Sequence, residues 1–196
     1  MSTSRATSSG SREPLGMDAR EIYTERLSLR LPTLGDFEES AAMWSDQGVV
    51  RHIGGRPFTR EESWLRLLRH VGHWQLLGFG FWVVRERNGG EYVGEVGLGD
   101  FRRETTPSFL GDPEIGWVLA RNAHGQGYAT EAARAALEWM RVRHRFERTV
   151  CMIEPGNAPS LGVAAKCGFR EFARTTYKTA AVMLLERIFP EENRSS

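Results

Sequence analysis

Residues 114 to 131 combine a carboxylate, a short apolar run and a loop with two glycines, in the sequence EIGWVLARNAHGQGYATE. Glu114 to Leu119 has the length of a strand, and Ala129 begins a helical pattern, so Gly125 and Gly127 fall between the two. Glycines let backbone N–H groups turn toward one point, and the positive end of the following helix dipole faces the same point. The pattern predicts a site for an anion such as phosphate, without a lysine.

Two well-known phosphate loops do not match this stretch. A Walker loop ends in Gly-Lys-Ser or Gly-Lys-Thr, and the dinucleotide fingerprint has a third glycine where Thr130 stands. For the glycine pair alone, a simple turn that starts a helix remains the alternative.

Composition narrows the class of protein. The chain has 196 residues, with 26 basic and 25 acidic side chains and 40% hydrophobic residues, which is enough for one domain. The balanced charge argues against a nucleic-acid binder, and no apolar run approaches the roughly 20 residues of a membrane span. Two cysteines, Cys151 and Cys167, make neither a disulfide framework nor a zinc set, so we expect a cytoplasmic protein with no metal.

The elements that must position these residues follow from hydrophobic spacing. Alternation predicts about seven strands: one with Leu27, Leu29 and Leu31, then Phe79–Arg85, Tyr92–Phe101, Glu114–Leu119, Thr149–Ile153, Phe169–Arg174 and Thr179–Ile188. Helical spacing predicts about four helices: one through Phe37, Ala41 and Trp44, one between Thr59 and Gly78, Ala129–Val142, and Ala158–Lys166. Hairpins joined to crossover helices indicate an α/β (α+β) fold, with helices flanking a mixed sheet.

The two ends of the chain differ from its middle. Residues 1–20 are rich in Ser, Gly and Arg with little to bury, which predicts a disordered extension. We therefore expect one domain over residues 21–190 and a short tail over 191–196.

Five short motifs occur in a recognisable order: Thr24-Glu-Arg-Leu27, Tyr92-Val-Gly-Glu-Val-Gly-Leu98, Glu114-Ile-Gly-Trp117, His124-Gly-Gln-Gly-Tyr-Ala-Thr-Glu-Ala132, and Asn157-Ala-Pro-Ser160 with Lys166-Cys-Gly-Phe169. From about Tyr23 to Ile188 the chain resembles the GNAT superfamily of acetyl-CoA-dependent N-acetyltransferases, in particular the branch that acetylates the N-termini of ribosomal proteins. The resemblance implies a central, mostly antiparallel sheet.

The resemblance also implies where coenzyme A binds. The loop from His124 to Ala129 would hold the pyrophosphate through backbone amides, although the superfamily usually has Gln or Arg where His124 stands. The pantetheine arm would pair with the strand that ends at Leu119, which puts Glu114 near the thioester. The implied contacts are Trp117, Val118, Leu119, His124, Gly125, Gln126, Gly127, Tyr128, Ala129, Thr130 and Asn157.

For catalysis the resemblance suggests direct attack of a primary amine in a ternary complex. Glu114 is a candidate general base and Glu95 is its competitor, while Glu114 could instead be an ordinary strand residue paired with an arginine. Ser160 matches the serine of this branch that protonates the departing thiolate, and it could equally be a helix-start residue. The tyrosine that other members use falls at Ala164 here.

We therefore expect an acetyl-CoA-dependent N-acetyltransferase that acts on a protein, peptide or small-molecule amine. The alternative is a non-catalytic sensor or interaction module that binds coenzyme A on the same fold. Neither version needs nucleic acid or a membrane, and both leave a homodimer open. Arg51, Arg56 and Arg60 near the expected acceptor side disfavour a polycationic acceptor, an argument that Glu61 and Glu62 soften.

Overall fold

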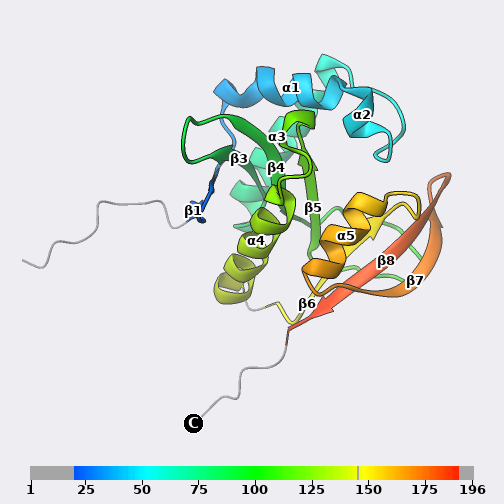
Figure 1. Cartoon of the computed structure of the whole chain (residues 1–196). Helices are drawn as coiled ribbons and strands as arrows, with labels where there is room; N and C mark the ends of the chain where they lie inside the picture. The colour runs from blue at the N-terminus through cyan, green and yellow to red at the C-terminus, as the bar shows by residue number, and fades with distance from the viewer. Residues whose placement is uncertain (1–19, 145, 190–196) are drawn as a thin grey trace, which may run out of the picture.

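The computed structural model describes residues 20–144 and 146–189, whose strands form one eight-stranded sheet (Figure 1). Its spatial order is β1-β2-β3-β4-β5-β6-β8-β7, and β5 with β6 is the parallel pair among otherwise antiparallel neighbours. The strands are β1 (Ile22–Tyr23), β2 (Leu27–Arg30), β3 (Phe81–Glu86), β4 (Tyr92–Gly99), β5 (Glu114–Leu119), β6 (Arg148–Ile153), β7 (Arg170–Tyr177) and β8 (Ala180–Ile188).

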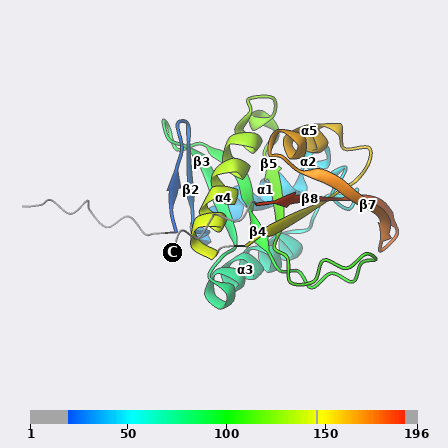
Figure 2. The same cartoon turned by 90° about the horizontal axis from the view of Figure 1, so that it is seen from below.

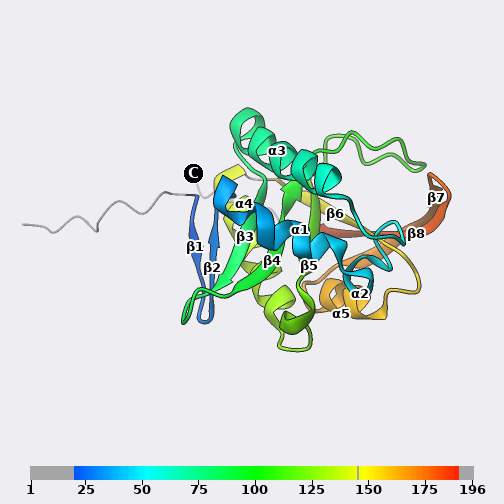
Figure 3. The same ribbon diagram turned by 90° about the horizontal axis from the view of Figure 1, so that it is seen from above.

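Helices cover both faces of the sheet. They are α1 (Phe37–Ser45), α2 (Gln47–Val50), α3 (Arg60–Leu77), α4 (Tyr128–His144) and α5 (Ala158–Lys166), with short 3-10 turns at Leu34–Asp36 and Arg121–Ala123. Helices α4 and α5 lie on one face and α3 lies on the other (Figure 2). Helix α1 lies on the α3 side, and the segment 100–113 runs along that same side toward the tip of β7 (Figure 3).

The α3 helix shows how local sequence sets these boundaries. Thr59 accepts the Glu62 amide and Glu62 reaches back to the Thr59 amide, which is the capping box that the sequence predicts. At the other end Gly78 adopts φ 73°, a left-handed conformation that glycine takes without strain. Its buried side chains, Leu67, His70 and Trp74, face the sheet.

The predicted fold class is confirmed, with two elements more than expected. The eighth strand, β1, has two residues and exists through its pairing with β2. The fifth helix, α2, is a single turn whose start is capped by Asp46. Neither is long enough to produce a hydrophobic period in the sequence.

The expected extension and tail, residues 1–20 and 191–196, fall outside the described residues except for Arg20. Within 20–144 and 146–189, no helix is both long and apolar enough to cross a bilayer.

Candidate functional site: an open strand edge beside a glycine loop

Strands β5 and β6 share a single registered pair, Glu114 with Val150, within the described part of the sheet. The opposite edge of β5 pairs with β4 along its length, and the Ala120 amide donates in that direction, to a β4 carbonyl 2.9 Å away. Because strand amides alternate in direction, those of Trp117 and Leu119 point to the edge that faces β6. At Trp117 and Leu119, β5 therefore presents backbone amides that β6 does not pair.

The glycine loop continues from this edge. Gly125 and Gly127 have φ of 77° and 82°, in the left-handed region that glycine favours. Glu131 is the first residue whose amide bonds back into the helix, to the Gly127 carbonyl. Within the described residues, the amides from Gly125 to Thr130 find no acceptor. Six donors thus gather at the positive end of α4, the arrangement predicted for an anion.

Side chains around the loop are engaged in holding it. The His124 ring lies 2.9 Å from the Leu119 carbonyl. The side-chain amide of Gln126 donates to the backbone carbonyl of Asn122 at 3.0 Å. His124 is thus tied to the end of β5, and both side chains shape the loop while its amides remain free.

A clamp from the N-terminal segment fastens the same loop. Arg26 donates to the Gln126 carbonyl at 2.9 Å and forms an ion pair with Glu131, which also accepts from the Thr24 hydroxyl at 2.6 Å. This contact explains why the Thr24-to-Leu27 motif accompanies the loop. The motif identified this segment in the sequence. The role of the segment depends on contacts with residues about a hundred positions away, which the motif alone does not predict.

Asn157 and Ser160 lie across the gap at the start of α5. The side-chain oxygen of Asn157 caps the helix by accepting a hydrogen bond from the Ser160 backbone amide at 3.2 Å. The side-chain NH₂ group of Asn157 is left for another partner. The Trp117 indole N–H donates to the Ser160 hydroxyl at 3.3 Å. Ser160 thereby keeps its own O–H hydrogen to donate, beside the open edge of β5. Ala164, the position of the tyrosine in other members, is fully buried.

Glu114 lies on the opposite face of β5, the α3 side, as period-two alternation predicts. It is 7% exposed and holds Arg103 through two contacts, one of them 2.9 Å long. The sequence left open whether Glu114 pairs with an arginine, and the structure shows that it does.

Glu95 shares that face but is more deeply buried, at 3% exposed. It accepts from Ser40 at 2.5 Å and Trp44 at 3.2 Å, and it contacts His70 at 3.3 Å and Arg66 at 3.5 Å. Burial opposes its charge, yet the hydrogen bond from His70 and the charge of Arg66 hold the pKa of Glu95 below its usual range.

Burial also changes the pKa values of the groups around Glu95. It lowers the pKa of His70 to about 4, so the ring is neutral at pH 7 and its Nε2–H donates to Glu95. It also lowers the pKa of Arg66 to about 10, which leaves the guanidinium charged. Both oxygens of Glu95 are therefore engaged, which makes Glu95 a poor proton acceptor.

Two of the arginines expected near the acceptor side are paired with carboxylates. Arg56 forms an ion pair with Glu62 and Arg60 forms one with Glu38, so neither presents a free charge. The cations that the sequence did not single out, Arg69 and Arg103, lie nearer to Glu114.

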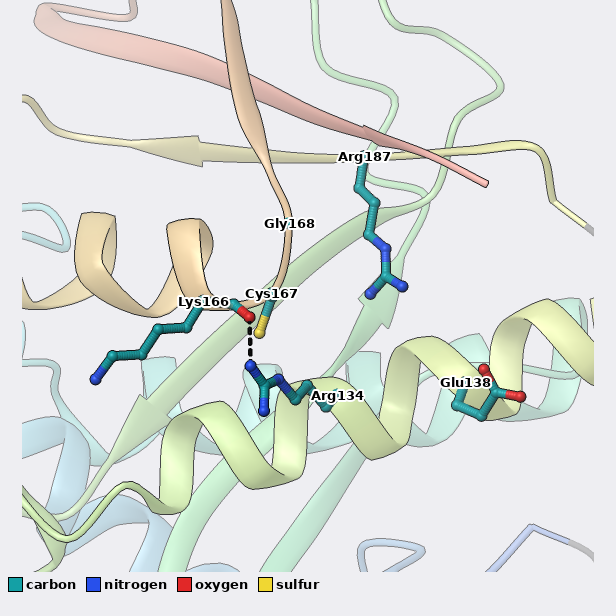
Figure 4. Close-up of a pocket in the computed structure, with 6 residues that line it drawn as sticks. All are labelled: Arg134, Glu138, Lys166, Cys167, Gly168 and Arg187. Carbon is teal, nitrogen blue, oxygen red and sulfur yellow. Dashed lines mark hydrogen bonds between the residues drawn. The ribbon is translucent and has the colours of Figure 1, made fainter. Parts of the chain in front are cut away.

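A separate depression of about 470 Å³ lies between α4 and the turn after α5 (Figure 4). It is lined by Arg134, Glu138, Lys166, Cys167, Gly168 and Arg187. The Arg134 guanidinium donates to the Lys166 carbonyl at 2.7 Å, while the Lys166 side chain points away. Arg134 thus ties α4 to the C-terminal end of α5, on the face of the sheet opposite Glu114.

Comparison with known proteins shows the family of the chain. The family described as Acetyltransferase (GNAT) domain matches residues 26–170. The uncharacterized protein YkkB of Bacillus subtilis is 34% identical over 162 residues, which cover 81% of this chain and 89% of that protein. A GnaT-family acetyltransferase structure from Bordetella pertussis has a TM-score of 0.75 and 33% identity, and the match covers 85% of this chain and 98% of that one.

Two more distant structures share the fold. The ribosomal-protein-S5-alanine acetyltransferase of Vibrio fischeri has a TM-score of 0.69 at 21% identity, over 86% of this chain and 96% of its own. The spermidine N-acetyltransferase of Vibrio cholerae, solved with CoA and spermine, has a TM-score of 0.66 at 16% identity, over 84% and 96%. With a matching family over most of its length and these relatives, the chain belongs to the GNAT acetyltransferase family.

Proposed function

We propose that this acetyltransferase uses acetyl-CoA and transfers its acetyl group to a primary amine in a ternary complex. The observation that carries the proposal is the continuity of two sets of free donors, the β5 edge and the Gly125–Thr130 amides. Going back from Ala120 to Glu114 covers on the order of 20 Å at about 3.3 Å per residue, comparable with an extended pantetheine arm. Asn157 would complete the coenzyme contacts through its NH₂ group.

Proton removal falls to Glu114 in this proposal. The amine must be neutral to attack, and a carboxylate at the point where β5 and β6 part can accept its proton, directly or through water. Glu95 is the weaker candidate because five groups, Tyr92 among them, already surround its two oxygens. The pair with Arg103 would hold Glu114 in place during the transfer.

The developing charges have separate partners. An amide on the open edge, such as that of Trp117, would stabilise the oxyanion, and a donor of this kind typically contributes about 3 to 4 kcal/mol. Ser160 would protonate the leaving thiolate, whose thiol pKa of about 8.5 already makes it a tolerable leaving group.

The acceptor class is argued from chemistry. With reference pKa values of about 7.7 to 8.0 against 10.4, an α-amine is roughly a tenth neutral at pH 7, while a lysine amine is below a thousandth. We therefore propose a peptide or protein N-terminus. Relatives of the fold act on ribosomal protein S5 and on spermidine, so likeness of fold alone does not choose between them. We further propose that residues 21–190 form the catalytic domain and that it works in the cytoplasm.

Two measurements test the proposal. Calorimetry with acetyl-CoA tests the coenzyme site, and we expect saturable binding. Thiol release across a panel of peptide and small amines separates an enzyme from a sensor, which would bind acetyl-CoA without turnover. Absence of acetyl-CoA binding would contradict both.

A further inference from the structure

Two arginines flank one aromatic ring on the α3 side of β5. The guanidinium carbons of Arg69 and Arg103 lie 5.2 and 4.9 Å from the centre of the Phe101 ring. Arg103 also lies 5.0 Å from the Tyr177 ring. These aromatic contacts fix the direction of both side chains without using their N–H donors.

We call these residues the Phe101 cluster: Arg69, Phe101, Arg103, Glu114 and Tyr177. Its positive and negative charges do not balance. Glu114 is the counter-ion of Arg103. Within the described residues, the Arg69 guanidinium makes neither an ion pair nor a hydrogen bond. Desolvation and the like charge of Arg103 lower the pKa of Arg69, while the charges of Glu95 and Glu114 oppose that shift.

Neighbouring charges do not supply the missing anion. Arg66 and Glu95 satisfy one another beneath the cluster, with side chains 15% and 4% exposed. His73, one turn along α3 from Arg69, lies close to the Arg69 and Asp100 carbonyl oxygens. Three arginines therefore face two carboxylates, and one positive charge remains at Arg69, which is exposed to solvent.

The position of this charge connects it to the reaction. Glu114 marks the point where β5 and β6 part, and Arg103 is bonded to it. Helix α3 and the segment 100–113 bring Arg69 and Arg103 to the same side of the sheet (Figures 2 and 3). A molecule whose amine reaches the thioester end from this side would pass beside Arg69.

Resting on the proposed amine acetylation, we propose that the acceptor carries a carboxylate close to its reacting amine and that Arg69, supported by Arg103, binds it. The acceptor class is then a peptide N-terminus with Asp or Glu at its second or third residue. The guanidinium forms two parallel hydrogen bonds to a carboxylate, which a neutral amide does not reproduce. A polyamine would be repelled.

Binding without turnover tests this directly. Calorimetry on protein saturated with CoA would compare two peptides that differ by Asp against Asn at the second residue. We expect the Asp peptide to bind about tenfold more tightly, as for one charge-assisted contact, and the preference to shrink at high salt. Arg69→Gln should remove the preference.

Arg60→Gln is the matched control, because Arg60 lies on the same helix and is paired with Glu38. It should keep the preference. Equal affinity for both peptides, a preference for the Asn peptide, binding of neither, or an unchanged preference in Arg69→Gln would each overturn the inference.

Thiol release separates this inference from the proposed function. If amines are acetylated with no preference for acidic peptides, the inference fails and the proposed function stands. If acidic peptides bind through Arg69 but no thiol is released from acetyl-CoA, the anion site stands and the proposed transfer fails.

Discussion

The two sides of β5 present different kinds of chemistry. On the side of α4 and α5, the free groups are backbone amides, and the side chains of His124, Gln126 and Asn157 are engaged in shaping the chain. On the face covered by α1 and α3, the chemistry belongs to charged side chains, among them Glu95 and Glu114. One strand therefore separates a surface built from backbone donors from one built from ionic side chains.

This difference predicts that the two sides respond differently to substitution. A backbone surface depends on glycines and a helix start, which tolerate changes of neighbouring side chains. An ionic surface changes with each substitution. The predictions below test whether the two sides respond separately.

The largest effect is expected on the ionic side. Glu95→Gln removes a buried counter-ion and leaves Arg66 and the neutral His70 without their partner, so we expect a loss of about 3 to 5 kcal/mol in the free energy of unfolding. Chemical denaturation measures it. Glu91→Gln, an exposed position next to β4, is the control and should change little. A stable Glu95→Gln variant would show that the cluster does not hold this side together.

A substitution in the glycine loop should weaken coenzyme A binding. In Gly127→Val a β-branched residue must adopt φ 82°, which strains the loop that carries the free amides, so we expect coenzyme A affinity to fall about 100-fold, or about 2.7 kcal/mol. Calorimetry measures the affinity. Gly90→Val, at φ 72° in the β3–β4 turn, carries similar strain away from the loop and should bind normally. Unchanged affinity in a folded Gly127→Val protein would refute the loop assignment.

On the ionic side, His70 should contribute to the pH dependence of stability. The pKa of His70 is about 4 in the folded protein against an ordinary 6.5, so between these values the unfolded chain binds a proton that the folded chain does not. Stability should therefore decrease by about 2 kcal/mol from pH 8 to pH 5 on account of this residue. His70→Gln should make the profile shallower, whereas His73→Gln, at a half-buried position of the same helix, should not. Parallel profiles for wild type and His70→Gln would contradict this.

The smallest effect is expected at the leaving group. Ser160→Ala should lower kcat about tenfold and leave the affinity for acetyl-CoA unchanged, because the departing thiol has a favourable pKa. Steady-state kinetics separates the two quantities. A complete loss of turnover would mean that Ser160 has a further role.

The sequence predicted one side of β5 better than the other, for a physical reason. The strand Glu114–Leu119, the glycine loop and the helix after it are continuous in the chain, so their spacing is readable as a pattern. The Phe101 cluster brings together α3, the segment 100–113 and β7. Because these segments are far apart in the chain, no local sequence pattern predicts which arginines lie close together. Arg56 and Arg60, which the sequence singled out, are neutralised by Glu62 and Glu38 instead.

The same reason applies to the N-terminal clamp and to the two extra elements. Arg26 acts through Gln126 and Glu131, far along the chain. Strand β1 and helix α2 are defined by a neighbouring strand and by one cap, which a search for periodicity does not detect.

The central claim, acetyl transfer to an α-amine with Glu114 as the base, is tested most directly by a pH–rate profile. Wild type and Glu114→Gln would be compared on two peptides that are identical except for a free or a blocked N-terminus. We predict that only the free peptide is acetylated, and that Glu114→Gln is slow near pH 7 and largely recovers near pH 9, where solvent has already made the amine neutral. Acetylation that is unaffected by the block, or identical profiles for the two enzymes, would contradict the account.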